Sequence, residues 1–190
     1  MPRPTPKDFS DERSMLLSFL DFQRRLARHR LTGLTDDRAK ERLVPSLTTP
    51  AGIISHLAAV ERFWFLRVLD GQSWQPPWTR DDPNADWRVR MIPLPDILAD
   101  YRSAVAEADE VIARHGLDDR AASGPAVDQR VTMRWILVHM IAETAQHNGH
   151  LDILCEQLDE AAAAADGGNG VSDAVAGGAR RGTNLAGAGA

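Results

Sequence analysis

The sequence lacks several features that would place it in familiar classes of protein. No apolar run approaches the roughly 20 residues that a membrane-spanning helix needs, and the N-terminal stretch MPRPTPKDFSDER has no apolar segment typical of a secretory signal. A single cysteine, Cys155, excludes an internal disulfide and a CxxC metal pair. These absences predict a cytoplasmic protein without a membrane partner, in which any metal ligands are histidine and carboxylate side chains.

Positive charge is also scarce. The formal net charge is −5, with 22 basic residues among 190, whereas a nucleic-acid-binding surface usually needs a concentrated basic patch. Nucleic acid is therefore excluded as an expected partner. Lys7 and Lys40 are the only lysines, and this arginine bias, together with abundant alanine, suggests a GC-rich coding genome.

Composition divides the chain into a folded unit and a tail. With 43% apolar and 26% charged residues, the chain as a whole can bury a core. From Glu160 onward, however, the sequence is almost entirely alanine, glycine and small polar residues, which cannot offset the entropy of ordering the chain. We therefore expect one folded domain within residues 1–159 and a disordered tail over residues 160–190.

Four stretches of the chain repeat their apolar residues with helical spacing, and no convincing strand pattern is seen. The first covers about Asp11–His29 and follows Ser10, a residue type that commonly caps helices. The second begins at Thr49-Pro50 and extends to about Asp70, where Gly71 would end it. Their apolar positions are Met15, Phe19, Phe22 and Leu26 in the first and Ile53, Leu57, Val60 and Trp64 in the second.

Two further helices are predicted, from about Pro95 to His115 and from Thr132 to about Leu158. Between the second and third helices lies the segment Gly71 to Pro93, which has no helical period, contains three tryptophans, and is long for a connection within a bundle. Four amphipathic helices without a strand predict an all-α protein. We expect a four-helix bundle with a long Trp/Pro-rich loop between its second and third helices.

The fourth predicted helix carries polar residues where its apolar stripe should continue. At about 100° per residue, seven positions fall within an arc of roughly 60° and would face the core. They are Ile136, Met140, Glu143, His147, Leu151, Leu154 and Leu158. On the second helix, His56 likewise lies among core positions. Because a buried carboxylate or unpartnered imidazole is costly, such residues are normally paired or bound to a metal.

His56, Glu143 and His147 are therefore candidate metal ligands. The i, i+4 spacing directs Glu143 and His147 toward one point, and His56 on a facing helix would add a third ligand, which leaves a fourth position open for water or substrate. Two other interpretations stay open. Glu143 and His147 can form a buried ion pair, or His147 and His150, spaced HxxH, can bind the metal with Glu143 as a base.

Other residues are candidates for supporting roles. His139 and His150 lie within about 60° of the polar residues on the same helix and would support the ligands or transfer protons. Trp78 and Trp87 of the long loop would form the wall or lid of a substrate pocket, or simply cover the end of the bundle. Arg134 is a candidate for binding an anionic group of the substrate.

Two residues have competing interpretations. Cys155 is flanked by leucines at helical spacing and is expected to be a buried, unreactive thiol rather than a nucleophile. Glu61, on the same helix as His56, would either support a ligand or contact an arginine.

The segments TTPAGIISHLAAVERFWFLRVLDG and VTMRWILVHMIAETAQHNGHLDIL resemble the DinB superfamily, in particular its DUF664 branch. The resemblance covers about residues 12–159 and rests on HLAxVERxW in the second helix and HMxxETAxHNGH in the fourth. It implies a four-helix bundle with a divalent metal, zinc or nickel, held by His56, Glu143 and His147. Most members have three histidines, and the glutamate is similar to that of the mycothiol-dependent maleylpyruvate isomerase.

The resemblance further implies a metal-dependent S-transferase or isomerase, with a low-molecular-weight thiol such as mycothiol as co-substrate and a small electrophile as substrate. Zinc is the expected metal because it suits sulfur, and nickel is the alternative. Metal-assisted hydrolysis would use the same ligands, as would a non-catalytic metal-binding stress protein. The apolar content of the first and third helices would permit a homodimer.

Overall fold

The computed structural model describes residue 6 and residues 10–123 and 131–168, and its regular elements are helices. In chain order these are α1 (Glu12–Arg30), α2 (Asp36–Ala39), α3 (Pro50–Glu61), the π-helix η1 (Arg62–Leu69), the 3₁₀-helix η2 (Ala85–Trp87), α4 (Leu94–Arg114) and α6 (Met133–Gly168). Within the described ranges, extended pairing is limited to a single bridge between Arg120 and Thr132. The predicted all-α class is confirmed.

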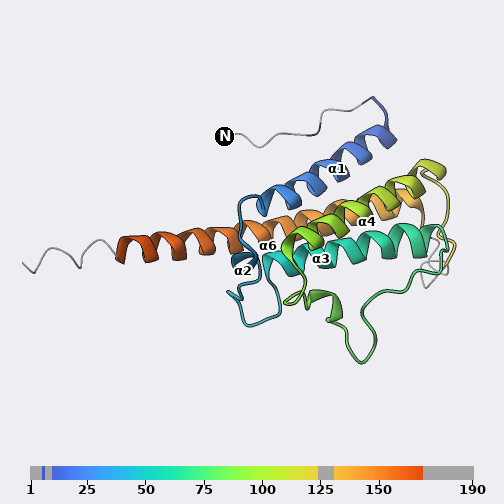
Figure 1. The fold of residues 1–190 in the computed structure, drawn as a ribbon. Helices are drawn as coiled ribbons and strands as arrows, with labels where there is room; N and C mark the ends of the chain where they lie inside the picture. Colours follow the sequence, from blue (N-terminus) through green and yellow to red (C-terminus); the bar gives the residue numbers. More distant parts are fainter. Residues whose placement is uncertain (1–5, 7–9, 124–130, 169–190) are drawn as a thin grey trace, which may run out of the picture.

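Four long helical segments lie alongside one another and form the bundle (Figure 1). Helix α1 packs mainly against α6 and α3 mainly against α4, and α3 also contacts α6. The chain between η1 and α4 leaves the bundle as a long loop that contains η2. The predicted bundle with its long loop is therefore confirmed. None of the described helices is both long and apolar enough to cross a membrane.

Side-chain caps explain where two of the helices begin. Asp11, rather than the expected Ser10, caps α1, because its Oδ1 accepts a hydrogen bond of 3.0 Å from the backbone N–H of Ser14. Thr49, where the second helix is predicted to begin, caps α3, since its Oγ1 accepts a hydrogen bond of 3.0 Å from the backbone N–H of Gly52. These caps satisfy N–H groups that have no partner within the first turn of a helix.

The buried face of α1 differs from the one that its apolar pattern predicts. Phe19, expected in the core, is 36% exposed, whereas Leu20, Arg24 and Ala27 are the buried residues of this helix. The prediction fails because Arg24 occupies a central buried position and so interrupts the apolar period that normally marks the buried face.

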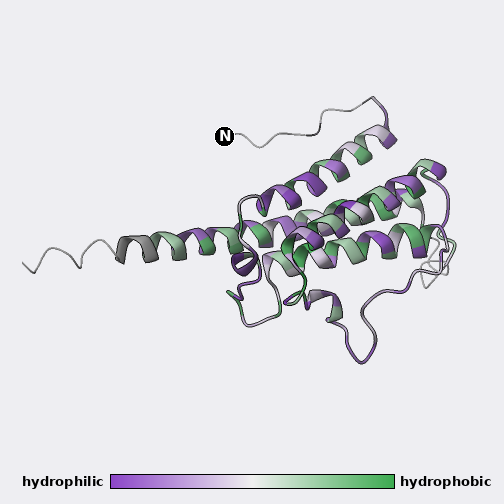
Figure 2. Cartoon of the chain, in the orientation of Figure 1, coloured by the Kyte–Doolittle hydropathy of each residue, from purple (hydrophilic) through white to green (hydrophobic). Residues whose placement is uncertain are grey.

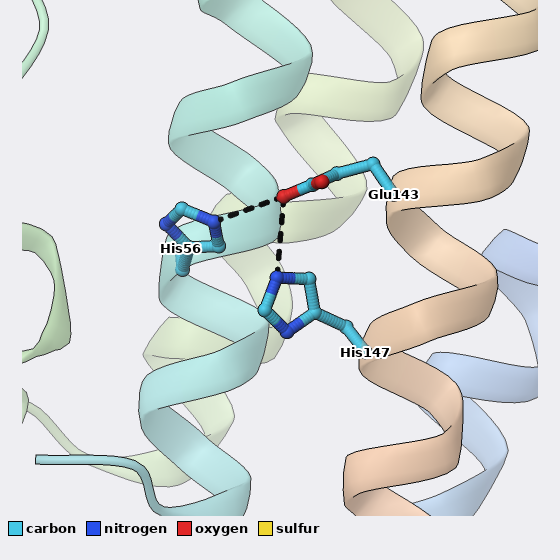
Figure 3. A group of neighbouring side chains, drawn as sticks. All are labelled: His56, Glu143 and His147. Atoms are coloured by element: carbon cyan, nitrogen blue, oxygen red, sulfur yellow. Dashed lines mark hydrogen bonds and ion pairs between the residues drawn. The ribbon is translucent and has the colours of Figure 1, made fainter. Parts of the chain in front are cut away.

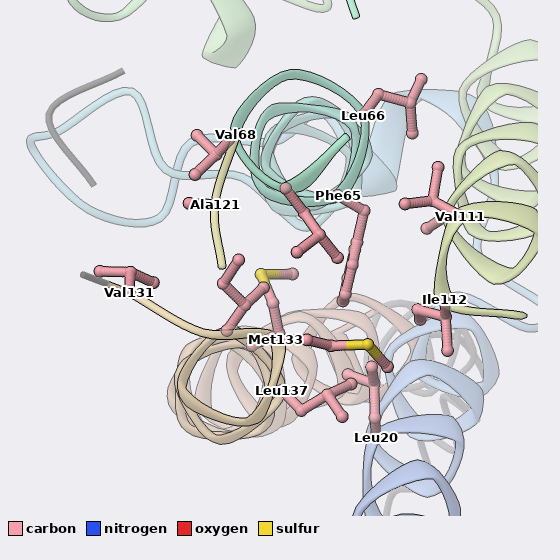
Figure 4. Packing of buried hydrophobic residues seen from close by; sticks show 14 of the residues in the cluster. Leu20, Phe65, Leu66, Val68, Val111, Ile112, Ala121, Val131, Met133 and Leu137 are labelled. Atoms are coloured by element: carbon pink, nitrogen blue, oxygen red, sulfur yellow. The ribbon is translucent and has the colours of Figure 1, made fainter. Parts of the chain in front are cut away.

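Two apolar clusters fill the bundle, one toward each end. The first includes Leu20, Phe65, Val111 and Met133, and Figure 4 shows these side chains converging from four helical segments. The second includes Ile53, Leu57, Tyr101 and Leu151. In Figure 2, hydrophobic and hydrophilic residues both recur along each long helix, as expected for amphipathic elements. The stripe of α6 passes from one cluster to the other, and the polar residues at 143 and 147 lie between them.

Helix α6 extends beyond its predicted end at Leu158. It continues to Gly168 because residues 161–165 are all alanine, the strongest helix former, and no glycine or proline occurs between Leu158 and residue 167. The expected boundary at residue 159 is therefore not where the helix ends. The remainder of the predicted tail, residues 169–190, lies outside the described residues.

Candidate metal centre

Three side chains converge between α3 and α6. His56 comes from α3, Glu143 and His147 come from α6, and they point toward one another (Figure 3). Glu143 Oε1 lies 3.4 Å from His56 Nε2 and 3.2 Å from His147 Nε2. One ligand atom from each residue lies within 4.8 Å of the other two, so the group can hold a metal ion. We call these three residues the ligand triad.

The two separations from Glu143 Oε1 in the ligand triad match those of a tetrahedral site. With metal–ligand bonds of about 2.0–2.1 Å, as for zinc bound to nitrogen or oxygen, neighbouring ligand atoms lie about 3.3 Å apart. Both distances from Glu143 Oε1 are close to this value. Two imidazoles and one carboxylate are also ligand types that zinc and nickel accept. The residues therefore fit a divalent metal with one coordination position left open.

Asp86 explains why the ligand triad favours a cation at its centre. Its Oδ2 lies 2.6 Å from His56 Nδ1, and the Asp86 side chain is buried. Because an ionised carboxylate only accepts hydrogen bonds, this contact assigns the proton to Nδ1 and leaves a lone pair on Nε2 of neutral His56. That lone pair faces a Glu143 oxygen at 3.4 Å. Two lone pairs in this position repel unless a proton or a metal ion lies between them.

Sequence reasoning missed Asp86. It belongs to η2 in the long loop, 30 residues after His56, and no periodicity or motif connects the two positions. The path of the loop over α3 brings them together, and the neighbouring Trp87 stacks on the His56 ring with 4.5 Å between ring centroids. The nearest signal in the sequence is the length and tryptophan content of the loop, which indicates a role at the site but no contact with a ligand.

The hydrogen bonds within the site shift the pKa values of its groups. The bond with His147, followed by that with His56, holds the pKa of Glu143 well below its usual range, so the carboxylate is ionised at neutral pH. Burial by itself lowers the pKa of His56, but the hydrogen bonds with Asp86 and Glu143 outweigh it and raise the pKa overall. Without a metal, His56 thus binds a proton more readily than an ordinary histidine, and proton and metal compete for it.

Two members of the ligand triad, His56 and Glu143, border a hollow of about 320 Å³ with aromatic walls. We call it the aromatic hollow. Its borders include Phe63 and Trp64 of η1, Trp78 and Trp87 of the long loop, His139 of α6, and the ligands His56 and Glu143. The two loop tryptophans predicted to contact substrate therefore lie beside the candidate ligands.

The π-helix η1 shapes one wall of the aromatic hollow. The second predicted helix has the expected extent, but after Glu61 it changes from α to π, a change that no sequence signal indicated. The i→i+5 bonds of a π-helix widen each turn, and Asp70 N–H donates such a bond of 3.1 Å to Phe65 O. The consecutive residues Phe63 and Trp64 both border the hollow. Gly71 follows with a φ of +72°, as a terminating glycine should.

His139 borders the aromatic hollow and is held between two tryptophans. Its ring stacks on Trp135 with 5.1 Å between centroids and meets Trp64 edge to face at 4.7 Å. Burial lowers the pKa of His139. Its imidazole is therefore mainly neutral at pH 7 and able to accept a proton.

His150 occupies a different position. Its side chain is exposed, its ring lies 5.4 Å from that of His147, and it borders a separate hollow of about 300 Å³ beside the loop that precedes α3. It is not part of the ligand triad. The structure brings His56, rather than His150, to Glu143 and His147, which favours the first of the two predicted ligand sets.

Arg134, the third predicted substrate residue, does not border the aromatic hollow. Its Nε donates a hydrogen bond of 2.7 Å to Glu12 Oε1, and its Nη1 donates to Asp118. Trp78 and Trp87 are thus brought to the site, while the guanidinium of Arg134 is engaged elsewhere.

The two residues with competing interpretations are also resolved by their contacts. Cys155 is half-buried, burial raises the pKa of its thiol, and its Sγ lies 3.6 Å from Arg30 O, all of which disfavour a nucleophilic thiolate. Glu61 contacts an arginine, since Arg24 Nε donates to Oε1 at 2.7 Å and Arg24 Nη2 donates to Oε2 at 2.6 Å.

A family model described as Mycothiol-S-transferase matches residues 15–160, which is most of the chain. The chain belongs to the mycothiol-S-transferase family. This family is part of the DinB-like superfamily, so the resemblance seen in the sequence is confirmed. The matched range of the mycothiol-S-transferase family contains the ligand triad, Asp86 and every residue that borders the aromatic hollow. A comparison with curated proteins gives no match.

Proposed function

We propose that the chain is a divalent-metal-dependent S-transferase that joins mycothiol, or a similar low-molecular-weight thiol, to a small electrophile. The observation that carries the proposal is the connected series Asp86–His56–Glu143–His147 at the edge of the aromatic hollow. Zinc is the expected ion and nickel the alternative. When bound, such an ion lowers the pKa of a thiol in its open position, so that thiolate forms near neutral pH.

The side chains around the ligand triad would orient the ligands and move the proton. Asp86 holds His56 with Nε2 directed at Glu143. His139 borders the same hollow with a pKa lowered by burial, so it would accept the proton that the thiol releases. His150 contacts His147 from the exposed side and would support that ligand or pass the proton to solvent.

The first test is the metal content of the untagged protein, purified without chelator and measured by elemental mass spectrometry. We expect about one zinc or nickel ion per chain, and loss of the ion in His56→Ala and in Glu143→Gln with helical circular dichroism retained. His29→Ala, which alters an exposed histidine of α1, is the matched control and should keep its metal. Empty and equally folded preparations of wild type and variants, even after zinc is added, would overturn the metal site.

Turnover separates the proposed transferase from its alternatives. Consumption of an electrophile only when thiol is added supports the transferase, and Glu143→Gln should abolish it. Metal-dependent hydrolysis without thiol would instead assign the same ligands to a hydrolase. A bound metal without turnover, whose removal unfolds the chain, would assign a non-catalytic role.

A further inference from the structure

We infer that the electrophile of this transferase is an uncharged aromatic or conjugated molecule that binds in the aromatic hollow, and not a carboxylic acid. The inference rests on the proposed function, because it names the class of the second substrate at the same site. Three features of the hollow support it: the rings in its walls, the charge balance beside the ligand triad, and the absence of lysine and arginine from the described residues that border it.

The walls of the hollow are joined by successive ring contacts. Between ring centroids, the distances are 6.4 Å from His56 to Trp78 and 5.6 Å from Trp78 to Phe63. They are 5.4 Å from Phe63 to Trp64 and 4.7 Å from Trp64 to His139. A flat ring entering this space can stack on one wall and meet another edge to face. A volume of about 320 Å³ is near the lower limit of small-molecule sites and suits one substituted ring.

The charges beside the ligand triad leave no excess positive charge for an anion. With two neutral imidazoles and Glu143, a divalent ion would leave a net charge of +1. The buried carboxylate of Asp86, 2.6 Å from His56, reduces that net charge to zero. A carboxylate substrate would have to leave water for a site without net positive charge, which is unfavourable.

Arginine, the usual partner of a carboxylate, is missing from the walls. Among the described residues that border the hollow there is no lysine or arginine. Two arginines of the same segments are paired with carboxylates, Arg62 of η1 with Asp100 at 2.9 Å and Glu107 at 2.8 Å, and Arg88 of the long loop with Asp82. Arg80 and Arg90 of the long loop also lie outside the set of residues that border the hollow, so no guanidinium of the described residues lines the space where an anionic substrate would bind.

Two unreactive probes test the inference without thiol or turnover. 1,3-Dinitrobenzene and 3,5-dinitrobenzoate differ by a single carboxylate, and their binding to the zinc-loaded protein can be followed by quenching of tryptophan fluorescence, corrected with free tryptophan. We expect the uncharged probe to bind about ten-fold more tightly, because the carboxylate finds no partner in the hollow. Equal or tighter binding of the benzoate would overturn the inference.

Variants of the hollow locate the bound probe. Trp78→Leu should weaken binding of dinitrobenzene by about three- to ten-fold, since it removes one ring from the walls. Pro83 is exposed and borders the hollow. Because Pro83→Arg adds a positive charge there, it should reduce the ratio of the two probe affinities by about three-fold, whereas the uncharged Pro83→Ser should leave that ratio unchanged. If neither Trp78→Leu nor Pro83→Arg alters binding in folded protein, the probe binds elsewhere and the inference is wrong.

Turnover then separates failure of the inference from failure of the proposed function. When a thiol reacts with 1-chloro-2,6-dinitrobenzene, the sulfur electron pair forms a C–S bond, chloride leaves with the electron pair of the C–Cl bond, and the thiol proton passes to a base or to solvent. 4-Chloro-3,5-dinitrobenzoate is the same electrophile with one carboxylate. With each rate divided by its uncatalysed rate, faster conversion of the uncharged electrophile supports the inference.

Faster conversion of the chlorinated benzoate would overturn the inference but still support the proposed transferase function. Turnover of neither electrophile with any thiol, despite selective binding of dinitrobenzene, would overturn the transferase and support only the selectivity of the hollow.

Discussion

Two glutamates of the same bundle, Glu61 and Glu143, have opposite surroundings. Glu61 is fully buried, and both of its oxygens accept hydrogen bonds from the guanidinium of Arg24, whose Nη1 also reaches Asp109 at 2.8 Å. The Glu143 side chain is 24% exposed, and one of its oxygens is shared between two histidines beside the aromatic hollow. A saturated buried carboxylate stabilises one structure, whereas a carboxylate shared by neutral imidazoles remains available to a cation.

The sequence presents these two glutamates in similar ways, since each lies on a helix that carries a candidate histidine ligand. The difference between them comes from Arg24 of α1, which is buried against Glu61. Substitutions at Arg24 should therefore lower the free energy of unfolding without changing the amount of bound metal. Substitutions around the ligand triad should weaken metal binding with little change in the free energy of unfolding.

The largest effect on stability is expected at the buried ion pair between Arg24 and Glu61. Arg24→Met would leave the charge of Glu61 buried and unpaired, so the free energy of unfolding should fall by about 3–5 kcal/mol. Urea denaturation measures this loss, and elemental mass spectrometry should still find the wild-type amount of metal in the folded fraction.

The matched control is the double variant Arg24→Met/Glu61→Leu, which removes both charges and should recover most of the lost stability. The contrast between Glu61 and Glu143 would be contradicted if Arg24→Met is as stable as the wild type, or if it loses its metal while still folded.

A smaller effect is expected at Asp86. Asp86→Asn keeps the shape of the side chain but weakens its hold on His56, so the affinity for zinc should fall by about 10- to 100-fold with little change in the free energy of unfolding of the metal-free protein. Competition with a chromophoric chelator measures the affinity. Asp82→Asn is the control, because Asp82 lies in the same loop but pairs with Arg88 and not with the ligand triad. Equal zinc affinities of the two variants would contradict a role for Asp86 in supporting the ligand His56.

The smallest effect is a shift in titration. In the metal-free protein the pKa of His56 is expected above its ordinary value of 6.5, and that of His139 below it. Because the folded-state pKa of His56 is raised, its contribution to stability is fully present below pH 6.5 and is lost as the pH rises through the folded-state pKa. With zinc present, the free energy of unfolding should instead increase as the pH rises, since metal binding requires neutral His56.

NMR titration of the imidazole rings measures both shifts. In Asp86→Asn the pKa of His56 should move down toward the ordinary value while that of His139 stays in place. A His56 that titrates below its ordinary value in the metal-free wild type would contradict the assigned contacts with Asp86 and Glu143.

Most of the fold and half of the site could be predicted from periodicity and spacing. The four helices follow from the recurrence of apolar residues, and the ligand triad follows from polar residues at core positions of the second and fourth helices. The buried face of α1 could not be predicted, because Arg24 breaks the apolar period and its partner lies 37 residues away. Arg134 was expected at the substrate, but its guanidinium pairs with Glu12 and Asp118.

The sequence by itself determined where the helices lie and which of their positions carry His56, Glu143 and His147, because periodicity is a local property of the chain. Only the tertiary structure decided that Asp86 meets His56 and that Arg24 pairs with Glu61 but not with Glu143. It also decided that loop tryptophans and η1 border a hollow with no lysine or arginine among its described residues. These contacts join residues far apart in the chain, and they depend on how helices pack and where an irregular loop runs, neither of which a local pattern encodes.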